Sequence, residues 1–156
     1  MKLYKRENYL KKIRGFYDAD DIIKVITGVR RCGKSSLMEM IASELRDNGV
    51  SEEKIIYLDL DKRGFKKVKT TDALEKCIDE RATADGLKYL FIDEIQNVKD
   101  FEELINGYRC EGGWSIFITG SNSYLLSGEL VTKLTGRYLE FEMFRLSFLV
   151  YDELKN

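Results

Sequence analysis

Short apolar runs alternate along the chain with longer segments in which apolar residues recur every three or four positions. The runs are rich in β-branched residues, which is typical of strands that are covered on both faces. They predict five strands, at residues 22–27, 55–60, 88–93, 115–120 and 137–144.

The amphipathic segments between these runs predict helices. One covers residues 4–17, and a second runs from a glycine-rich turn to a stop signal at Gly49. A third begins near Asp72 and Glu75, which have the spacing of an N-cap pair. Further helices are expected at residues 101–109, within residues 121–135, and in the last dozen residues.

Strands and helices that alternate at this spacing indicate an α/β domain, with a parallel sheet and helices on both faces. A chain of 156 residues is expected to form one domain. No apolar run reaches the roughly 18 residues that span a membrane, and no apolar signal core follows the basic start. We therefore expect a cytoplasmic protein.

Composition excludes several kinds of chemistry. The chain has no histidine, which excludes histidine catalysis and the commonest metal ligand. Its cysteines, Cys32, Cys77 and Cys110, are odd in number and far apart, which favours a reducing compartment over a disulfide framework or a zinc site. The net charge of −1 gives no overall nucleic-acid signal.

The junction between the first strand and the second helix carries the clearest motif. Residues 28–35, GVRRCGKS, have the P-loop spacing G-x-x-x-x-G-K-[ST]. Such a turn directs backbone N–H groups and a helix N-terminus at phosphate oxygens. Lys34 can reach the β- and γ-phosphates, and Ser35 is placed to ligate Mg²⁺. The predicted nucleotide-binding residues are Gly28, Arg30, Arg31, Cys32, Gly33, Lys34, Ser35 and Ser36.

Three residues inside this turn have two interpretations each. Cys32 is either a small spacer or an oxidation-sensitive control of binding, because Lys34 and the helix amides would favour its thiolate. Arg30 and Arg31 either contact phosphate or a neighbouring subunit, or at least one of them points to solvent.

The strand at residues 88–93 ends in a second charged motif, Asp93-Glu94. An apolar strand followed by this pair has the Walker B pattern, and in a parallel sheet Asp93 would lie beside the P-loop. We expect Asp93 to hold Mg²⁺ together with Ser35, and Glu94 to polarise the attacking water. Gln96 either helps to orient that water or caps the next turn.

The glutamate next to Asp93 favours a protein that hydrolyses ATP. Many P-loop kinases and GTPases place their catalytic groups elsewhere, whereas hydrolysing and remodelling ATPases carry this glutamate. The guanine-reading order N-K-x-D has no match, since the nearest segment, residues 97–100, reads N-V-K-D. We therefore predict ATP and Mg²⁺ as the ligands.

Two further segments offer groups for the γ-phosphate. At the tip of the fourth strand, Thr119, Ser121 or Asn122 could contact it, although Ser121 and Asn122 are equally suited to cap a helix. Arg137 is the candidate for an arginine delivered in cis or from a neighbouring subunit, which can raise turnover by about 10³ to 10⁵. The alternative is that Arg137 is a surface residue that forms a salt bridge. The predicted catalytic residues are Lys34, Glu94, Ser121 and Arg137.

Four segments, GVRRCGKSSLM, FIDEIQNV, FITGSNSYLLSGEL and LTGRYLEFEMFRLSF, resemble the N-terminal AAA-type domain of a large group of bacterial and archaeal ATPases. The resemblance runs over nearly the whole chain. It implies a P-loop NTPase fold in three layers, α-β-α, with a five-stranded parallel sheet in the order 5-1-4-3-2. It also implies ATP binding with Mg²⁺-dependent hydrolysis. The roles of the group fall on Lys34, Ser35, Asp93, Glu94, the tip around Ser121, and Arg137.

Members of this group usually have a proline where this chain has Arg145, and they continue into helical or winged-helix and C-terminal domains. We therefore expect residues 1–156 to form the ATPase core, without a lid and a C-terminal domain. Hydrolysis would drive work by absent domains or by partners such as a homo-oligomer or a protein client. The alternative is a nucleotide-binding switch without turnover in isolation.

The most biased segment is DKRGFKKVKTT, residues 61–71, which we predict to be a loop. Its basic residues could contact the phosphates of nucleic acid, which would make the chain a nucleic-acid-linked ATPase. The alternative is a solvated loop, because the rest of the domain is near neutral and Phe65 is the only aromatic residue among the basic ones.

Overall fold

The computed structural model describes residues 2–28, 33–121, 130, 133–134 and 136–143. All strands in this part of the chain pair in parallel, in one sheet of order β2-β3-β4-β1-β5. This order confirms the predicted 5-1-4-3-2 arrangement. The strands are β1 (Ile23–Gly28), β2 (Ile55–Asp59), β3 (Lys88–Asp93), β4 (Trp114–Ser121) and β5 (Tyr138–Met143).

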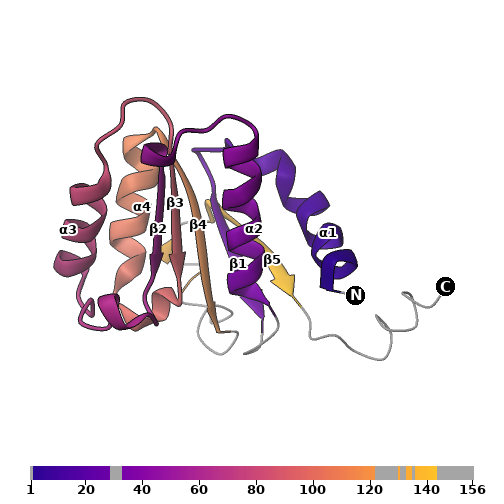
Figure 1. Cartoon of the computed structure of the whole chain (residues 1–156). Coiled ribbons are helices and arrows are strands. Elements are labelled where there is room, and N and C mark those ends of the chain that lie inside the picture. The colour runs from indigo at the N-terminus through magenta and orange to yellow at the C-terminus, as the bar shows by residue number, and fades with distance from the viewer. Residues whose placement is uncertain (1, 29–32, 122–129, 131–132, 135, 144–156) are drawn as a thin grey trace.

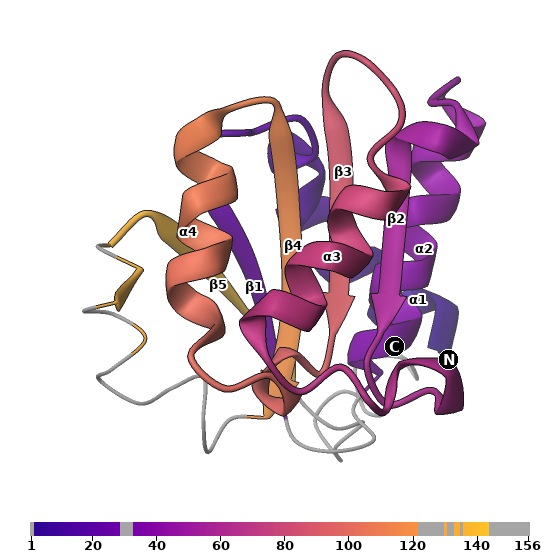
Figure 2. The same cartoon turned by 90° about the vertical axis from the view of Figure 1, so that its left-hand side faces the viewer.

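Helices cover both faces of the sheet, which confirms the three-layer prediction. Figures 1 and 2 show α1 and α2 on one face and α3 and α4 on the other. The α-helices are α1 (Lys2–Ile13), α2 (Lys34–Asp47), α3 (Thr71–Arg81) and α4 (Phe101–Glu111). Short 3₁₀ helices are η1 (Arg14–Phe16), η2 (Glu52–Lys54), η3 (Arg63–Phe65) and η4 (Ile95–Asn97).

The sheet separates two hydrophobic cores, because alternate residues of each strand face opposite sides. In β3, Phe91 faces α1 and α2 and stacks on Phe117 with ring centroids 4.7 Å apart. Its neighbours Leu90 and Ile92 belong to the other core, under α3 and α4. Burial on both faces explains why the strands appear in the sequence as nearly continuous apolar runs.

Two helix boundaries differ from the prediction. Helix α1 ends at Ile13 and continues as the 3₁₀ turn η1, so it is shorter than the predicted span of residues 4–17. The predicted N-cap pair at Asp72 and Glu75 is wrong, because the cap of α3 is Thr70, whose hydroxyl accepts a hydrogen bond from the Ala73 N–H at 3.2 Å. Asp72 instead lies in the first turn.

Residues 122–129 and the last dozen residues lie outside the described part, so the helices expected there stay predictions. Within the described part, no helix is long and apolar enough to cross a lipid bilayer. Cys77 and Cys110 are free thiols, and Cys32 lies outside the described residues.

Candidate functional site

The carboxyl ends of the parallel strands meet at one edge of the sheet, and the predicted site residues gather there. Gly28 at the end of β1 is in register with Ser121 of β4. Asp93 at the end of β3 is in register with Asp59 of β2. In Figure 1 this edge is the one toward which the strand arrows point. We call it the carboxyl edge.

The P-loop turn connects β1 to α2 across this edge. Gly33, the residue before α2, has φ 100° and ψ 19°, a left-handed conformation that glycine adopts without a steric penalty from Cβ. Its carbonyl accepts a hydrogen bond from the Leu37 N–H at 2.9 Å, so the helix begins immediately after it. Arg30, Arg31 and Cys32 lie outside the described residues.

Lys34 is a buried cation at the start of α2, with only 6% of its surface exposed. Its ammonium group donates to the Gly28 carbonyl at 2.7 Å, which directs the side chain toward the end of β1. No carboxylate of the described residues forms an ion pair with it. An ammonium group has three donors, and a buried charge without a counter-charge is costly, so this position is suited to an anionic ligand.

Ser35 and Asp93 meet directly across the edge. The Ser35 hydroxyl donates to Asp93 Oδ2 at 2.5 Å, and Asp93 is 1% exposed. A hydroxyl and a carboxylate are hard oxygen donors of the kind that Mg²⁺ prefers. The pair predicted from the sequence as metal ligands is therefore brought together, and Ser36 follows on the first turn of α2.

Thr119 of β4 connects Asp93 to Glu94. Its buried hydroxyl donates to Asp93 Oδ1 and accepts a hydrogen bond from the Glu94 N–H at 3.0 Å. Of the three predicted candidates at the strand tip, Thr119 is therefore engaged in holding the acidic pair. Ser121 lies beside Gly28 at the strand end, and Asn122 lies outside the described residues.

Glu94 adopts an unusual backbone conformation immediately after β3. Its φ is 60° and its ψ is 52°, a left-handed conformation that is uncommon for a residue other than glycine. Its carboxylate accepts a hydrogen bond from the Gln96 amide at 2.5 Å. The other amide atom, Gln96 Oε1, is buried and has no hydrogen-bond partner among the residues that the structure describes. Gln96 therefore holds the Glu94 carboxylate, and it has a free acceptor of its own.

Two residues at this edge were not predicted from the sequence. Burial, and after it the charge of Asp93, raises the pKa of the Asp59 carboxyl, although a hydrogen bond from the Asp61 N–H opposes the rise. Tyr57 donates to the Ser35 carbonyl at 3.3 Å and stacks on Phe91. The signal for Asp59 was available, because this acidic residue lies near the end of the apolar run at residues 55–60.

Arg137 is not brought to the carboxyl edge within one chain. Its carbonyl accepts a hydrogen bond from the Ile23 N–H at 3.0 Å, which places it at the amino end of β1. At about 3.3 Å per residue, Gly28 lies roughly 17 Å further along this strand. Arg137 is exposed, so a role in a neighbouring subunit stays a prediction.

These features define the class of P-loop nucleotide-binding folds. They are a strand, a glycine-containing turn, a lysine at a helix N-terminus, and a serine–aspartate pair beside them in a parallel sheet. Within this class the chain belongs to the AAA domain family, which matches its residues 20–151. The family match confirms the resemblance that the motifs indicated.

Two curated relatives are similar in sequence, and both are described as uncharacterized proteins. One, from Haemophilus influenzae, is 41% identical over 152 residues, which is 97% of this chain and 38% of that protein. The other, MJ1544 from Methanocaldococcus jannaschii, is 35% identical over 135 residues, which is 86% of this chain and 29% of that protein. The chain therefore spans well under half the length of either relative.

Solved structures share the fold at low sequence identity. A DNA polymerase III gamma subunit-related protein from Thermotoga maritima has a TM-score of 0.62 at 11% identity, over 94% of this chain and 49% of that chain. Cdc6p from Pyrobaculum aerophilum has a TM-score of 0.58 at 11% identity, over 88% of this chain and 44% of that chain. Such identities establish the likeness of the fold alone.

Proposed function

We propose that this AAA domain binds ATP with Mg²⁺ at the carboxyl edge and hydrolyses it to ADP and phosphate. The observation that carries the proposal is the buried ammonium group of Lys34, which has no carboxylate partner among the described residues and stands beside the Ser35–Asp93 pair. A buried cation of this kind is stabilised when an anion binds.

In this proposal the residues of the turn divide the work of binding. The N–H groups of residues 28–35 and the N-terminus of α2 hold the phosphates, and Lys34 neutralises charge on the β- and γ-phosphates. Ser35 and Asp93 would hold Mg²⁺, which offsets the negative charge of the triphosphate. Neither role requires a large rearrangement, since both side chains already lie at this edge.

Glu94 is the proposed base that orients the attacking water. Its backbone is fixed by Thr119, and its carboxylate is held by Gln96. Release of the Gln96 bond would free the carboxylate to accept a proton from water. The same bond favours a second candidate function, a nucleotide switch in which Glu94 stays engaged and the isolated chain binds ATP without turnover.

The work that hydrolysis drives belongs to parts outside this chain. Because the chain spans 38% and 29% of its two curated relatives, we propose that further domains or protein partners use the nucleotide cycle. An oligomer in which Arg137 reaches the site of a neighbouring subunit is one form that this coupling could take.

Calorimetric titration with ATP and Mg²⁺ tests the binding proposal. Lys34→Ala should weaken ATP affinity by at least about 30-fold, since loss of a buried charge partner costs about 2 kcal/mol or more. Lys76→Ala, which removes an exposed lysine on α3, is the matched control and should bind as the wild type does. Equal affinity in the two variants would contradict the proposal.

A phosphate-release assay separates the enzyme from the switch. Glu94→Gln should retain ATP affinity and lose turnover by about 10²- to 10⁴-fold, the usual contribution of a general base. If the wild type binds ATP and releases no phosphate, the switch is the correct function. Unchanged turnover in Glu94→Gln would exclude Glu94 as the base.

A further inference from the structure

The carboxyl edge carries a second charged surface beside the nucleotide site. The segment between β2 and α3 lies at this edge of the sheet (Figure 2). It brings exposed cations together, and the loop before α4 adds one more, because the Lys99 N–H donates to the Lys69 carbonyl at 3.3 Å. We call these six residues the basic edge: Lys62, Arg63, Lys66, Lys67, Lys69 and Lys99.

Within the described part of the chain, no residue of the basic edge forms an ion pair. The ion pairs of the described residues use Arg14, Arg46 and Lys133, and none of them includes a residue of the basic edge. Because the whole chain carries a net charge of −1, the residues outside the basic edge have a net negative charge. The positive surface is therefore local, and an overall charge count does not detect it.

The apolar residues of this segment face inward. Val68 is 8% exposed and belongs to the core under α3 and α4, and Phe65 packs against the same core. The guanidinium of Arg81 lies over the Phe65 ring at 5.3 Å, which covers that ring as well. The basic edge thus offers charge without an aromatic platform for bases and without an apolar group to insert into a lipid layer.

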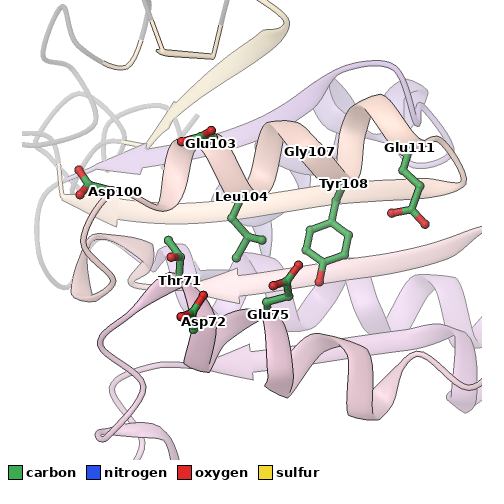
Figure 3. A pocket seen from close by; sticks show the side chains of 9 residues that line it. All are labelled: Thr71, Asp72, Glu75, Asp100, Glu103, Leu104, Gly107, Tyr108 and Glu111. Carbon is green, nitrogen blue, oxygen red and sulfur yellow. The ribbon is translucent and has the colours of Figure 1, made fainter.

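An acidic cleft of about 600 Å³ between α3 and α4 bounds this surface. Figure 3 shows Leu104 and Tyr108 pointing from α4 toward α3, with carboxylates around them. The acidic residues that line it are Asp72, Glu75, Asp100, Glu103 and Glu111. Since like charges repel, a polyanion held at the basic edge would be kept away from this face.

We propose that the basic edge binds the phosphate backbone of nucleic acid, without base recognition. Exposed cations with no apolar centre match a partner that is read through its phosphates, whereas protein partners usually need a buried apolar core at the contact. This binding is independent of ATP hydrolysis. It also lies next to the nucleotide site, because Asn97 of η4 donates to the Asp61 carboxylate at 2.9 Å and connects the segment to the turn after Glu94.

Fluorescence anisotropy with a labelled duplex, without nucleotide, tests this proposal on the whole chain. If the six cations each contact a phosphate, wild-type affinity should fall about 10³-fold between about 50 and 200 mM salt. The triple variant Lys66→Gln, Lys67→Gln, Lys69→Gln should bind more weakly and show only about a 40-fold fall over the same range. The matched control is Lys11→Gln, Lys12→Gln, Lys76→Gln, which removes the same charge from exposed positions elsewhere.

The control variant should bind the duplex as the wild type does, which separates the basic edge from net charge. Equal losses in the two triple variants would overturn the proposal, as would the absence of duplex binding at low salt. If the basic-edge triple variant alone loses binding to phosphatidylserine vesicles, the surface would instead be assigned to a membrane. If it alone loses self-association in sedimentation, the surface would be assigned to the acidic cleft of a second copy. ATP titration of the same variants measures the nucleotide site separately. A failure of duplex binding can therefore be told apart from a failure of ATP binding.

Discussion

Lys24 and Lys34 are both buried, but they lie at opposite edges of the sheet and have different surroundings. Lys24, near the amino end of β1, is fully enclosed and donates to the Ala19 carbonyl at 2.5 Å and to the Ser115 hydroxyl at 2.8 Å. Its ammonium group also lies 4.7 Å from the centre of the Phe117 ring. Lys34 has one acceptor among the described residues, the Gly28 carbonyl.

The hydroxyl groups of β4 repeat this difference. Ser115, at the amino end, donates to the Tyr17 carbonyl at 2.5 Å and so fixes the turn that leads into β1. Thr119, at the carboxyl end, holds two acidic residues instead. At the amino edge, Lys24 and Ser115 are paired with neutral groups of the protein, whereas at the carboxyl edge Thr119 is paired with two acidic residues. Burial is therefore common to both lysines, and the difference between them lies in their hydrogen-bond partners.

The largest expected effects come from replacing each buried lysine by alanine, because one substitution should affect stability and the other ATP binding. Lys24→Ala should lower the free energy of unfolding by about 2–4 kcal/mol, because it leaves a cavity and an unpaired carbonyl. ATP affinity of the folded protein should stay within about twofold of the wild type. Lys34→Ala should do the reverse, with a stability change below about 1 kcal/mol and a large loss of affinity. Urea unfolding measures the free energy of unfolding, and calorimetric titration measures ATP affinity. If both variants change the two quantities in the same way, the proposed difference between the lysines is wrong.

The pH dependence of stability gives a second contrast. Burial lowers the pKa of Lys24 to about 7, although Asp21, Asp20 and Asp18 act in the opposite direction. Between pH 7 and the ordinary lysine value of about 10.4, the unfolded chain binds a proton that the folded chain does not, so stability rises with pH. From about pH 7 to pH 9 the gain should be about 2 kcal/mol. Lys24→Met should flatten this rise, which urea titrations at several pH values would detect, and a rise of the same size in Lys24→Met would assign it to other groups.

The smallest expected effect separates the two hydroxyl groups of β4. Thr119→Val should lower kcat about tenfold with little change in ATP affinity, since it removes the hydrogen bonds that Thr119 makes with Asp93 Oδ1 and with the Glu94 N–H, at a cost of about 1 kcal/mol. Thr119→Ser should restore turnover. Ser115→Ala should lower stability by a similar amount and leave kcat unchanged. Steady-state kinetics and thermal unfolding of the three variants measure these effects. A turnover defect in Ser115→Ala would contradict the expected difference between the two hydroxyl groups.

Much of the fold and of the central site could be predicted from the sequence, because both depend on local patterns. Strands buried on two faces appear as apolar runs, and the turn from β1 to α2 has a fixed spacing of glycines, lysine and serine. Asp93 was found since a charged residue at a strand tip is visible without knowledge of its neighbours.

The remaining features depend on register and strand direction, which no local pattern specifies. Asp59 approaches Asp93 only because β2 and β3 are neighbours with their ends aligned. The burial of Lys24 depends on a hydroxyl of β4 and a carbonyl before β1. The sequence left open whether Arg137 acts in cis or from a neighbouring subunit, and strand direction bears on this choice, since a residue that precedes a parallel strand lies at the edge opposite the carboxyl ends.

The left-handed backbone of Glu94 has a consequence for how this position can evolve. A glycine there would relieve steric strain of about 1 kcal/mol or more and would remove the carboxylate. Drift toward a more stable domain would therefore favour glycine here, and the proposed role of the Glu94 carboxylate in turnover would oppose it. If Glu94 is the base that we propose, related domains with glycine or asparagine at this position should keep the fold and lack turnover.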